Sequence, residues 1–438
     1  MKKIVILSAV FFLANYIAVA EQKQSDPNLV AELKQKAEQG DPEAQFNLGL
    51  HYEDGQVVEL DYKQAAYWYR KSAEQGHALA QFNLGVCYAK GEGVEQDYNQ
   101  AVYWYRKAAE QGDALAQFSL GRRYLEGQGV EQDYKQAVYW FRKAAEQGYA
   151  TGLGYCYEKG QGVEQDYKQA VYWYRKAAEQ GDADAQSRLA VRYAQGEGVE
   201  QNYKQAVYWL LKAAEQGHAL AQFSLGAHYA EGQGVEKDYK QAAYWYQKAA
   251  EQGIAKAQFS LGAYYSEGRG VEQDYNQASY WYHKAAEQGD AEAQSSLGFH
   301  YAKGDVVEQD YKQSVYWWRK AAEQGHALAQ FNLGVFYANG RGVEQDYKQA
   351  VYWFRNAAEQ GDAKAQFNLG VYYVKGEGVI EDYIEAYKWF LLAGVNGEDV
   401  SKQKMDLRDK LSPTGIEEAQ RRAKEFLKQQ EINKNPAK

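Results

Sequence analysis

One stretch of sequence recurs down the chain and limits what the chain can fold into. Each copy resembles Val130–Gly148 and closes on a glycine. Successive closing glycines lie 36 residues apart, except that Gly148 and Gly181 are 33 apart. A period of about 20–50 residues that persists over most of a chain predicts a solenoid, in which one supersecondary unit stacks on copies of itself. The closing glycines are Gly40, Gly76, Gly112, Gly148, Gly181, Gly217, Gly253, Gly289, Gly325, Gly361 and Gly397.

Ten copies follow the first of these glycines, and we number the positions in each from 1 to 36. In the first half, apolar residues at positions 4, 8 and 12 form one helical stripe, and positions 2, 6 and 9 form a second. In the second half, positions 25, 28, 29 and 32 follow the i, i+3, i+4, i+7 spacing of a core-facing helix. Each unit is therefore predicted to be a helical hairpin, and the chain an all-α, right-handed α-solenoid superhelix. The predicted repeats are 41–76, 77–112, 113–148, 149–181, 182–217, 218–253, 254–289, 290–325, 326–361 and 362–397.

Three local signals support the hairpin. Glycines at positions 15 and 17, such as Gly127 and Gly129, predict the end of the first helix. Asp133 at position 21, with Gln136 three residues later, predicts a capped start of the second helix. Gly121 at position 9 lies inside the first helix, where glycine costs about 1 kcal/mol of helix propensity. Its recurrence predicts that two helices approach closely there.

The two ends of the chain differ from the repeats. Residues 1–20 are predicted to be a signal peptide, because Lys2 and Lys3 precede an apolar run and Ala18–Ala20 fits the cleavage pattern. The alternative is an uncleaved membrane anchor, although the run is short for a span and no later segment could span a membrane. We therefore expect an exported protein, either periplasmic or secreted. Residues 21–40 are predicted to be a lead-in and capping helix, and 398–438 capping helices with a polar tail.

Charge and cysteine content exclude several functions. The chain of 438 residues has a net charge of −9, and loss of Lys2 and Lys3 with the signal would make it −11. A basic footprint is absent, which argues against a nucleic-acid partner. Cys87 and Cys156 occupy the same position two repeats apart. Helices pack about 8–10 Å apart and a disulfide needs Cα atoms within about 7 Å, so no bridge between them is expected.

The repeat resembles the Sel-1-like repeats, which are relatives of the tetratricopeptide repeats. The resemblance covers residues 41–397 and is carried by the recurring alanine, glutamine, glycine, tyrosine and tryptophan positions, as in Ala219–Gly253 and Ala327–Gly361. It implies an adaptor or scaffold for protein partners. A cysteine-rich bacterial branch of the family is associated with penicillin binding and β-lactam hydrolysis, but each of its repeats is stapled by a cysteine pair. With only Cys87 and Cys156, this chain departs from that branch.

A tryptophan recurs at position 28 of every repeat, within the core-facing stripe. Such rings could stack on sugars or peptides, but their position in the stripe predicts the core instead. Trp318, at the neighbouring position 29, is also predicted to lie in the core. The predicted core tryptophans are Trp68, Trp104, Trp140, Trp173, Trp209, Trp245, Trp281, Trp317, Trp353 and Trp389.

The first helices carry the positions that vary while the rest of the repeat stays fixed. Positions 3, 7, 10 and 11 lie away from the core stripe, and first helices line the concave face in solenoids of this type. Arginine and aromatic residues there favour a protein or peptide partner, because both are enriched at binding hot spots. Neutral variation on an exposed face is the alternative. The predicted binding residues are Arg122, Arg123, Arg192, Tyr264, Phe299, His300, Phe336 and Tyr372.

The sequence offers no catalytic, cofactor-binding or metal-binding constellation. The seven histidines lack the spacing of a metal site, and the recurring Asp at position 21 is explained as a helix cap. Three functions remain: a non-catalytic scaffold for a protein or peptide, an envelope protein that binds or hydrolyses a peptidoglycan or β-lactam-like ligand, and a structural spacer. The short fourth repeat is either a hinge or a tolerated deletion.

Overall fold

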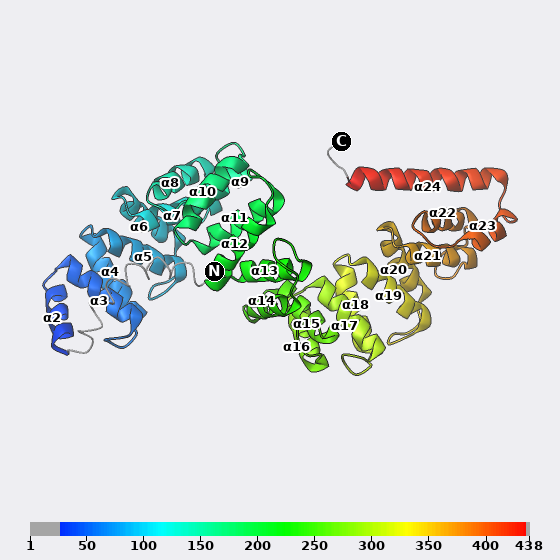
Figure 1. Ribbon diagram of the computed structural model, residues 1–438, viewed down its shortest axis with the longest axis horizontal. Coiled ribbons are helices and arrows are strands. Elements are labelled where there is room, and N and C mark those ends of the chain that lie inside the picture. Colours follow the sequence, from blue (N-terminus) through cyan, green and yellow to red (C-terminus); the bar gives the residue numbers. More distant parts are fainter. Residues whose placement is uncertain (1–26, 435–438) are drawn as a thin grey trace. The chain divides into compact units, whose positions relative to one another are not determined.

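A computed structural model describes residues 27–434, which form 23 helices and contain no strand. The predicted signal peptide lies outside the described residues. The chain divides into two compact units, and the division falls between Ala213 and Ala214, inside α12 (Tyr203–Glu215). In each unit the helices form consecutive antiparallel hairpins stacked on one another (Figure 1). The predicted all-α fold of stacked hairpins is confirmed.

The first unit begins with α2 (Pro27–Glu38), a single helix packed against the first repeat. Five repeats follow, each with a first and a second helix. Their hairpins are α3 (Pro42–Asp54) with α4 (Tyr62–Glu74), α5 (Ala78–Lys90) with α6 (Tyr98–Glu110), α7 (Ala114–Glu126) with α8 (Tyr134–Glu146), α9 (Thr151–Lys159) with α10 (Tyr167–Glu179), and α11 (Ala183–Gln195) with α12.

The second unit holds the other five repeats and two further helices, α23 (Ser401–Arg408) and α24 (Pro413–Lys434). Both of these helices pack against the last second helix, α22. The hairpins are α13 (Ala219–Glu231) with α14 (Tyr239–Glu251), α15 (Ala255–Glu267) with α16 (Tyr275–Glu287), α17 (Ala291–Lys303) with α18 (Tyr311–Glu323), α19 (Ala327–Asn339) with α20 (Tyr347–Glu359), and α21 (Ala363–Lys375) with α22 (Tyr383–Val395).

The helices begin and end at residues that recur in most repeats, namely a capping aspartate and two loop glycines. In the third repeat, Asp133 Oδ1 accepts hydrogen bonds from the backbone amides of Lys135 and Gln136 at 2.8 and 3.0 Å, so the cap of α8 is confirmed. Gly127 ends α7 in the left-handed region at φ 68°. Gly129 is needed for a second reason, because a Cβ atom there would lie 2.1 Å from the carbonyl oxygen of Tyr98 in the preceding repeat.

The close approach predicted at position 9 is also confirmed. In nine repeats this residue is a glycine packed against the aromatic ring at position 29; a Cβ atom on Gly334, for example, would lie 2.8 Å from Cδ1 of Phe354. The fifth repeat alone has Ala190 at position 9, and there position 29 is Leu210 instead of an aromatic residue. Both of these residues are buried. The methyl group and the aromatic ring therefore exclude each other.

In every repeat except the fourth, a buried glutamine at position 5 bonds the helix that precedes the repeat. Gln81, at position 5, donates its Nε2 hydrogen to the carbonyl oxygen of Ala73 in the preceding repeat at 3.1 Å. Its Oε1 accepts from Nε2 of Gln111, at position 35 of the same repeat, at 2.8 Å. Gln111 also donates to the carbonyl oxygen of Gly76 at 3.0 Å. These bonds tie the end of one repeat's second helix to the next repeat, and the carbonyl oxygen of Ala73 also accepts from the amide of Gly76 at 3.0 Å.

The fourth repeat lacks one turn of its first helix. Helix α9 has nine residues, where other first helices have 13, and it begins without a side-chain cap. Thr151 instead donates a hydrogen bond to Asp182 of the next repeat at 2.9 Å. Gly152 faces the ring of Phe141, and Gly154 faces that of Tyr174. Packing therefore continues through the shortened repeat, and the division between the units lies one repeat later.

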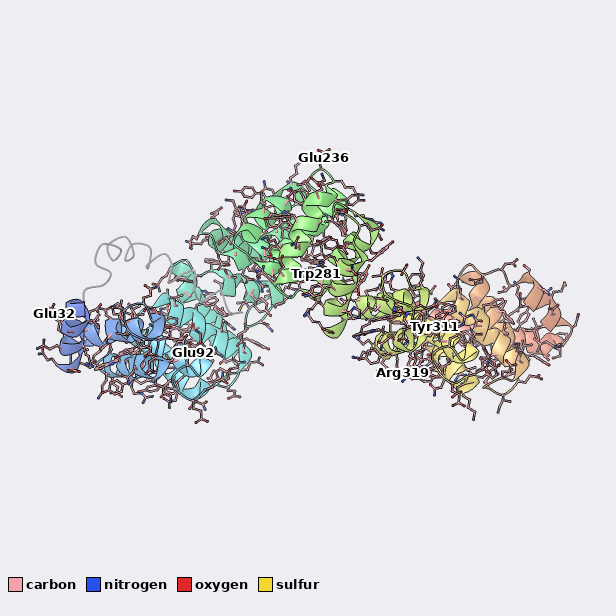
Figure 2. All side chains as sticks on the ribbon, turned by 90° about the horizontal axis from the view of Figure 1, so that it is seen from below. Glu32, Glu92, Glu236, Trp281, Tyr311 and Arg319 are labelled. Carbon is pink, nitrogen blue, oxygen red and sulfur yellow. The ribbon has the colours of Figure 1, made fainter. Side chains whose placement is uncertain are left out.

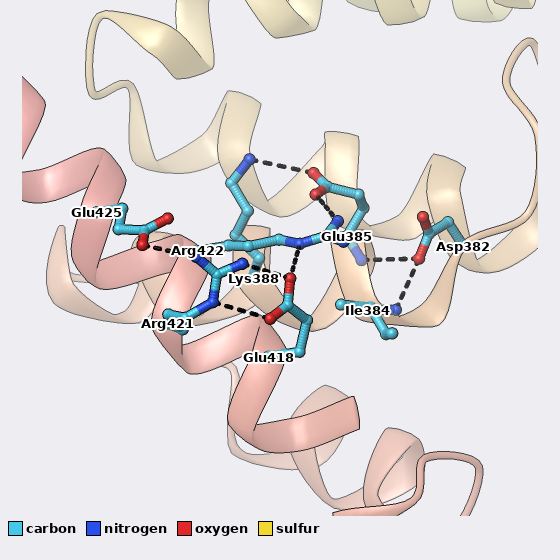
Figure 3. A network of polar contacts seen from close by, with 8 residues as sticks. All are labelled: Asp382, Ile384, Glu385, Lys388, Glu418, Arg421, Arg422 and Glu425. Atoms are coloured by element: carbon cyan, nitrogen blue, oxygen red, sulfur yellow. Dashed lines mark hydrogen bonds and ion pairs between the residues drawn. The ribbon is translucent and has the colours of Figure 1, made fainter. Parts of the chain in front are cut away.

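Helix α24 covers the end of the second unit (Figure 3). Phe426 packs on Trp389 with ring centroids 5.5 Å apart. Arg422 bonds Glu385 of α22 at 2.6 Å, and Lys388 bonds the same carboxylate at 3.1 Å. Within α24, hydrogen bonds from Arg421 and Arg422 lower the pKa of Glu418 to about 2. The apolar face of the last repeat is thereby covered by a helix with a charged outer side.

Candidate binding surface

In each unit, first helices of neighbouring repeats lie next to one another. Helix α7 contacts α9 in the first unit, and α17 contacts α19 in the second. We call the side chains at positions 3, 7 and 10 of these helices the first-helix surface. It carries four large apolar side chains that are about half exposed, one in the first unit and three in the second. They are Leu79, Leu220, Phe299 and Leu328, with exposed fractions of 48, 57, 51 and 54%.

Two of the predicted binding residues belong to this surface. Phe299, at position 10 of the eighth repeat, is one of its exposed rings. Arg122, at position 10 of the third repeat, exposes 43% of its side chain and pairs with Glu126 of its own helix at 2.9 Å. An exposed pair of this kind contributes little to stability, so the guanidinium remains free to exchange its partner.

The predictions at position 11 need correction. Arg192, Tyr264 and Phe336 are buried, and Arg123 is only partly exposed. Position 11 follows the buried leucine at position 8 by three residues, so both share one face of the helix. There the side chain meets the second helix of the preceding repeat: Phe336 contacts Trp318, with centroids 4.8 Å apart.

Tyr372 and His300 also turn toward the interior. Tyr372 packs on Phe354 with centroids 5.7 Å apart, and burial raises its pKa. The ring of His300 stacks on Tyr282 at 5.3 Å, and its Nδ1 lies 2.7 Å from Asp305. Burial by itself would raise the pKa of Asp305, but hydrogen bonds from Lys303 and His300 lower it to about 2.

The two arginines at position 11, of which Arg192 is buried and Arg123 is partly exposed, are also held in place. The guanidinium of Arg123 lies 4.9 Å from the ring centroid of Tyr98 and bonds Gln128. That of Arg192 lies 5.4 Å from the ring of Tyr167 and bonds Glu197. Each arginine therefore fastens a first helix to the preceding repeat and to its own loop. The sequence did not indicate this role, because the partner tyrosine lies in another repeat.

The tryptophans of position 28 lie inside or at the edge of the core. Trp173 and Trp281 are half-buried, the latter labelled in Figure 2, and the other eight are buried. Trp318 is buried as well, with Nε1 3.0 Å from the carbonyl oxygen of Ser295.

The sequence did not indicate a second exposed surface, which we call the outer tyrosines. These residues precede the tryptophans at position 27 of the second helices and are about half exposed. Each ring stands edge-on to its tryptophan at 4.8–5.0 Å. A lysine ammonium lies near the ring in most repeats, as Lys107 does at 5.3 Å from Tyr103. The outer tyrosines are Tyr67, Tyr103, Tyr139, Tyr172, Tyr208, Tyr244, Tyr280, Tyr316 and Tyr352.

The first-helix surface contains a hollow of about 220 Å³ between the eighth and ninth repeats. Phe299 and Leu328 form its apolar walls, and Glu292 lies at its rim. Its remaining lining residues are Ser295, Ser296, His300 and Asn332. Glu292 accepts a hydrogen bond from His326 Nε2 at 3.2 Å, and Nδ1 of that ring caps α19 by accepting from the amide of Ala329.

A buried polar cluster lies in the fourth repeat. The hydroxyl of Tyr174 donates to Glu158 at 2.7 Å, and both side chains are buried. Burial by itself would raise the pKa of Glu158, but hydrogen bonds from Lys159 and Tyr174, together with the charge of Arg192, lower it. The carboxylate is thus held in its charged form inside the first unit, where it stabilises the shortened repeat.

Among residues 27–434, no group of three or more histidine, cysteine or acidic side chains is placed to hold a metal ion. None of the described helices is long and apolar enough to cross a membrane. Cys87 and Cys156 are both free and buried.

The repeats match a known family model. The model of the Sel1 repeat fits ten consecutive segments from residue 42 to residue 394, each beginning one residue later than the predicted repeat. The chain belongs to the Sel1 repeat family. Proteins with this fold are typically scaffolds for protein–protein interaction, and the resemblance inferred from the sequence is confirmed.

Solved structures agree with this assignment. The Sel1 chain is similar to c5321, described as a protective antigen of uropathogenic Escherichia coli with an SLR fold. The two are 38% identical over 91% of this chain and 94% of that one, with a TM-score of 0.55. A Sel1 repeat protein from Oxalobacter formigenes is 35% identical over 68% of this chain and 87% of that one, with a TM-score of 0.51. A comparison with curated proteins gave no match.

Proposed function

We propose that this protein is an exported, non-catalytic scaffold that binds a protein or peptide on its first-helix surface. The observation that carries the proposal is the presence of exposed leucine and phenylalanine side chains on first helices whose other faces hold the repeats together, three of them in the second unit. These apolar residues are separated by polar positions, as in interfaces that form and dissociate. The family's typical role as a scaffold supports the same function.

The test is affinity capture with residues 21–438 and two variants, each with five substitutions by serine. One variant changes exposed residues of the first-helix surface, and the other changes an equal number of outer tyrosines. Circular dichroism first establishes that all three proteins are equally helical. The first variant replaces Leu79, Arg122, Leu220, Phe299 and Leu328, and the second replaces Tyr103, Tyr139, Tyr244, Tyr316 and Tyr352.

We expect partners retained by the unchanged protein and the tyrosine variant to be lost with the first-helix variant. Partners lost only with the tyrosine variant would refute the first-helix surface as the binding site. Capture that is the same for all three proteins would refute both surfaces and favour a structural spacer.

The outer tyrosines support a second candidate, the binding of a peptidoglycan-like envelope glycan. Exposed aromatic rings provide flat apolar faces, and the nearby lysines offer hydrogen-bond donors. Co-sedimentation of the same three proteins with insoluble peptidoglycan tests this function. It requires binding that the tyrosine variant loses and the first-helix variant keeps.

Export rests on the predicted signal peptide at residues 1–20 and is tested separately. Cell fractionation followed by N-terminal sequencing should find a protein that begins at Glu21 in the periplasm or the medium. A full-length protein in the cytoplasm would contradict it.

A further inference from the structure

The hollow between the eighth and ninth repeats lies where seven other repeats place an aromatic ring of their own. Position 6 is phenylalanine in seven repeats and serine in two, Ser187 and Ser295. In those seven repeats its ring packs against the ring at position 29 with centroids 5.5–5.9 Å apart. The eighth repeat has Ser295 at this position, and the hollow opens over that residue.

Trp318 compensates for only part of the missing ring. It replaces the tyrosine or phenylalanine that the other aromatic repeats have at position 29, and its Nε1 reaches the carbonyl oxygen of Ser295 at 3.0 Å. The space toward the first-helix surface stays open as the hollow of about 220 Å³. Small-molecule sites are commonly about 300–1,000 Å³, so this volume suits a single side chain.

The walls of the hollow indicate what kind of side chain fits. Phe299 of α17 and Leu328 of α19 both line the hollow and are both about half exposed, so an apolar group that contacts them would remove their surfaces from water. Glu292 at the rim leaves 69% of its side chain exposed and carries a negative charge. A positive charge next to the inserted group would therefore be attracted to the rim.

We propose that this hollow binds an aromatic side chain of a partner peptide, with a lysine or arginine next to that residue in the peptide. The inserted ring takes the place of the phenylalanine that the other repeats supply themselves, and the cation pairs with Glu292. This inference rests on the proposed protein-binding function and assigns one specificity-determining position within it.

Disulfide capture tests the hollow without knowledge of the partner. Asn332→Cys places a thiol in the lining, and Asn368→Cys places one at the same position of the next repeat, where Phe331 is present. The native thiols Cys87 and Cys156 are buried. Each variant is equilibrated with cysteamine disulfides of 2-phenylethanethiol and 2-hydroxyethanethiol under mild reduction, and the adducts are counted by mass spectrometry.

We expect N332C to capture the phenylethyl group about tenfold or more over the hydroxyethyl group, because burying a ring is that favourable. The control N368C should show no such preference. Filling the hollow with Ser295→Phe and Trp318→Tyr, the pair found in other repeats, should abolish the preference of N332C. N332C should form more adduct with a phenyl disulfide that also carries an ammonium group than with the neutral phenyl disulfide. Glu292→Gln should remove this difference and leave the preference for the phenyl group unchanged.

Equal capture profiles at the two thiols, or a preference that survives the filled hollow, would overturn the site. This result would leave the protein-binding function standing if affinity capture still depends on the first-helix surface. Conversely, selective capture by N332C together with failed affinity capture would refute the proposed function but not the hollow. An equal response to the charged and neutral phenyl compounds would overturn the role of Glu292.

Discussion

The exclusion between a methyl group at position 9 and a ring at position 29 can be tested by exchanging one repeat's pair for another's. The perturbation is Gly334→Ala in α19, alone and together with Phe354→Leu in α20. The double variant has the pair that the fifth repeat carries as Ala190 and Leu210. All of the affected packing lies within the second unit.

Two opposing terms decide the result. Alanine is favoured over glycine inside a helix by about 1 kcal/mol. Against this, the new Cβ atom would lie 2.8 Å from Cδ1 of Phe354, well inside the normal contact distance of about 3.5–4.0 Å, and that ring is only 1% exposed. Overpacking of this kind costs about 1–3 kcal/mol. Gly334→Ala should therefore destabilise the repeat by about 0–2 kcal/mol when the ring is present, and stabilise it by about 1 kcal/mol after Phe354→Leu.

Hydrogen exchange followed by mass spectrometry is the suitable assay, because repeat arrays do not unfold in one step and a local free energy is needed. Peptides from α19 and α20 report the opening free energy of this hairpin in the four proteins of the cycle. Ala190→Gly in the fifth repeat is the matched control and should cost about 1 kcal/mol, since no ring is relieved there. If Gly334→Ala has the same effect with and without Phe354, within about 0.5 kcal/mol, the exclusion does not exist.

Three further predictions concern other contacts. His326→Asp places a carboxylate beside Glu292, so the substitution should destabilise the start of α19 through like-charge repulsion. Glu292→Leu should reduce that destabilisation by about 0.5–1 kcal/mol, measured by hydrogen exchange of the Ala329 amide. Additive effects of the two substitutions would refute the contact between these residues. Tyr174→Phe should destabilise the first unit by about 1–3 kcal/mol near neutral pH, because the charged Glu158 loses a buried donor. The pKa of Glu158 is lowered by folding, so this stabilisation is present above the usual value of 4.5 and is lost as the pH falls below it. Denaturation of both proteins at pH 7 and pH 3 should show that the difference in stability is smaller at pH 3. A difference that stays constant would contradict the assignment. Burial raises the pKa of Cys87 and of Cys156 to about 12. A disulfide reagent at neutral pH should therefore label neither thiol in the folded protein and both after denaturation. Labelling of the folded protein would refute the burial of these thiols.

The hairpin could be predicted from the sequence because its signals are local. The glycine at position 15, the aspartate at position 21 and the spacing of apolar residues all act within one helix or one turn. Position 9 could also be interpreted, since a glycine inside a helix needs a reason. The partner that supplies the reason, the ring at position 29, lies in the same repeat.

Position 11 was misjudged because its environment is supplied by the preceding repeat. Position 11 is not one of the positions 4, 8 and 12 from which the core stripe was predicted, but the second helix of the preceding repeat covers Tyr264 and Phe336 there. The same limit hid the histidine caps. His77, His218 and His326 each follow a repeat with an acidic residue at position 3, namely Glu43, Asp184 and Glu292. The structure shows contact for the first and last of these pairs. Comparing position 1 with the preceding position 3 would have found the pattern.

The glutamine bonds between neighbouring repeats have a consequence for how the length of such a chain can change. Gln81 bonds Ala73 of one neighbour, and Gln294 bonds Ala286 in the same way, so an excision of 36 residues rejoins surfaces that already match. The fourth repeat is three residues shorter, and its first helix lacks one turn and has no side-chain cap. Loss or duplication of a whole repeat of 36 residues would therefore preserve these glutamine bonds at the new junction. A shorter deletion removes them, as in the fourth repeat, which has no glutamine at position 5.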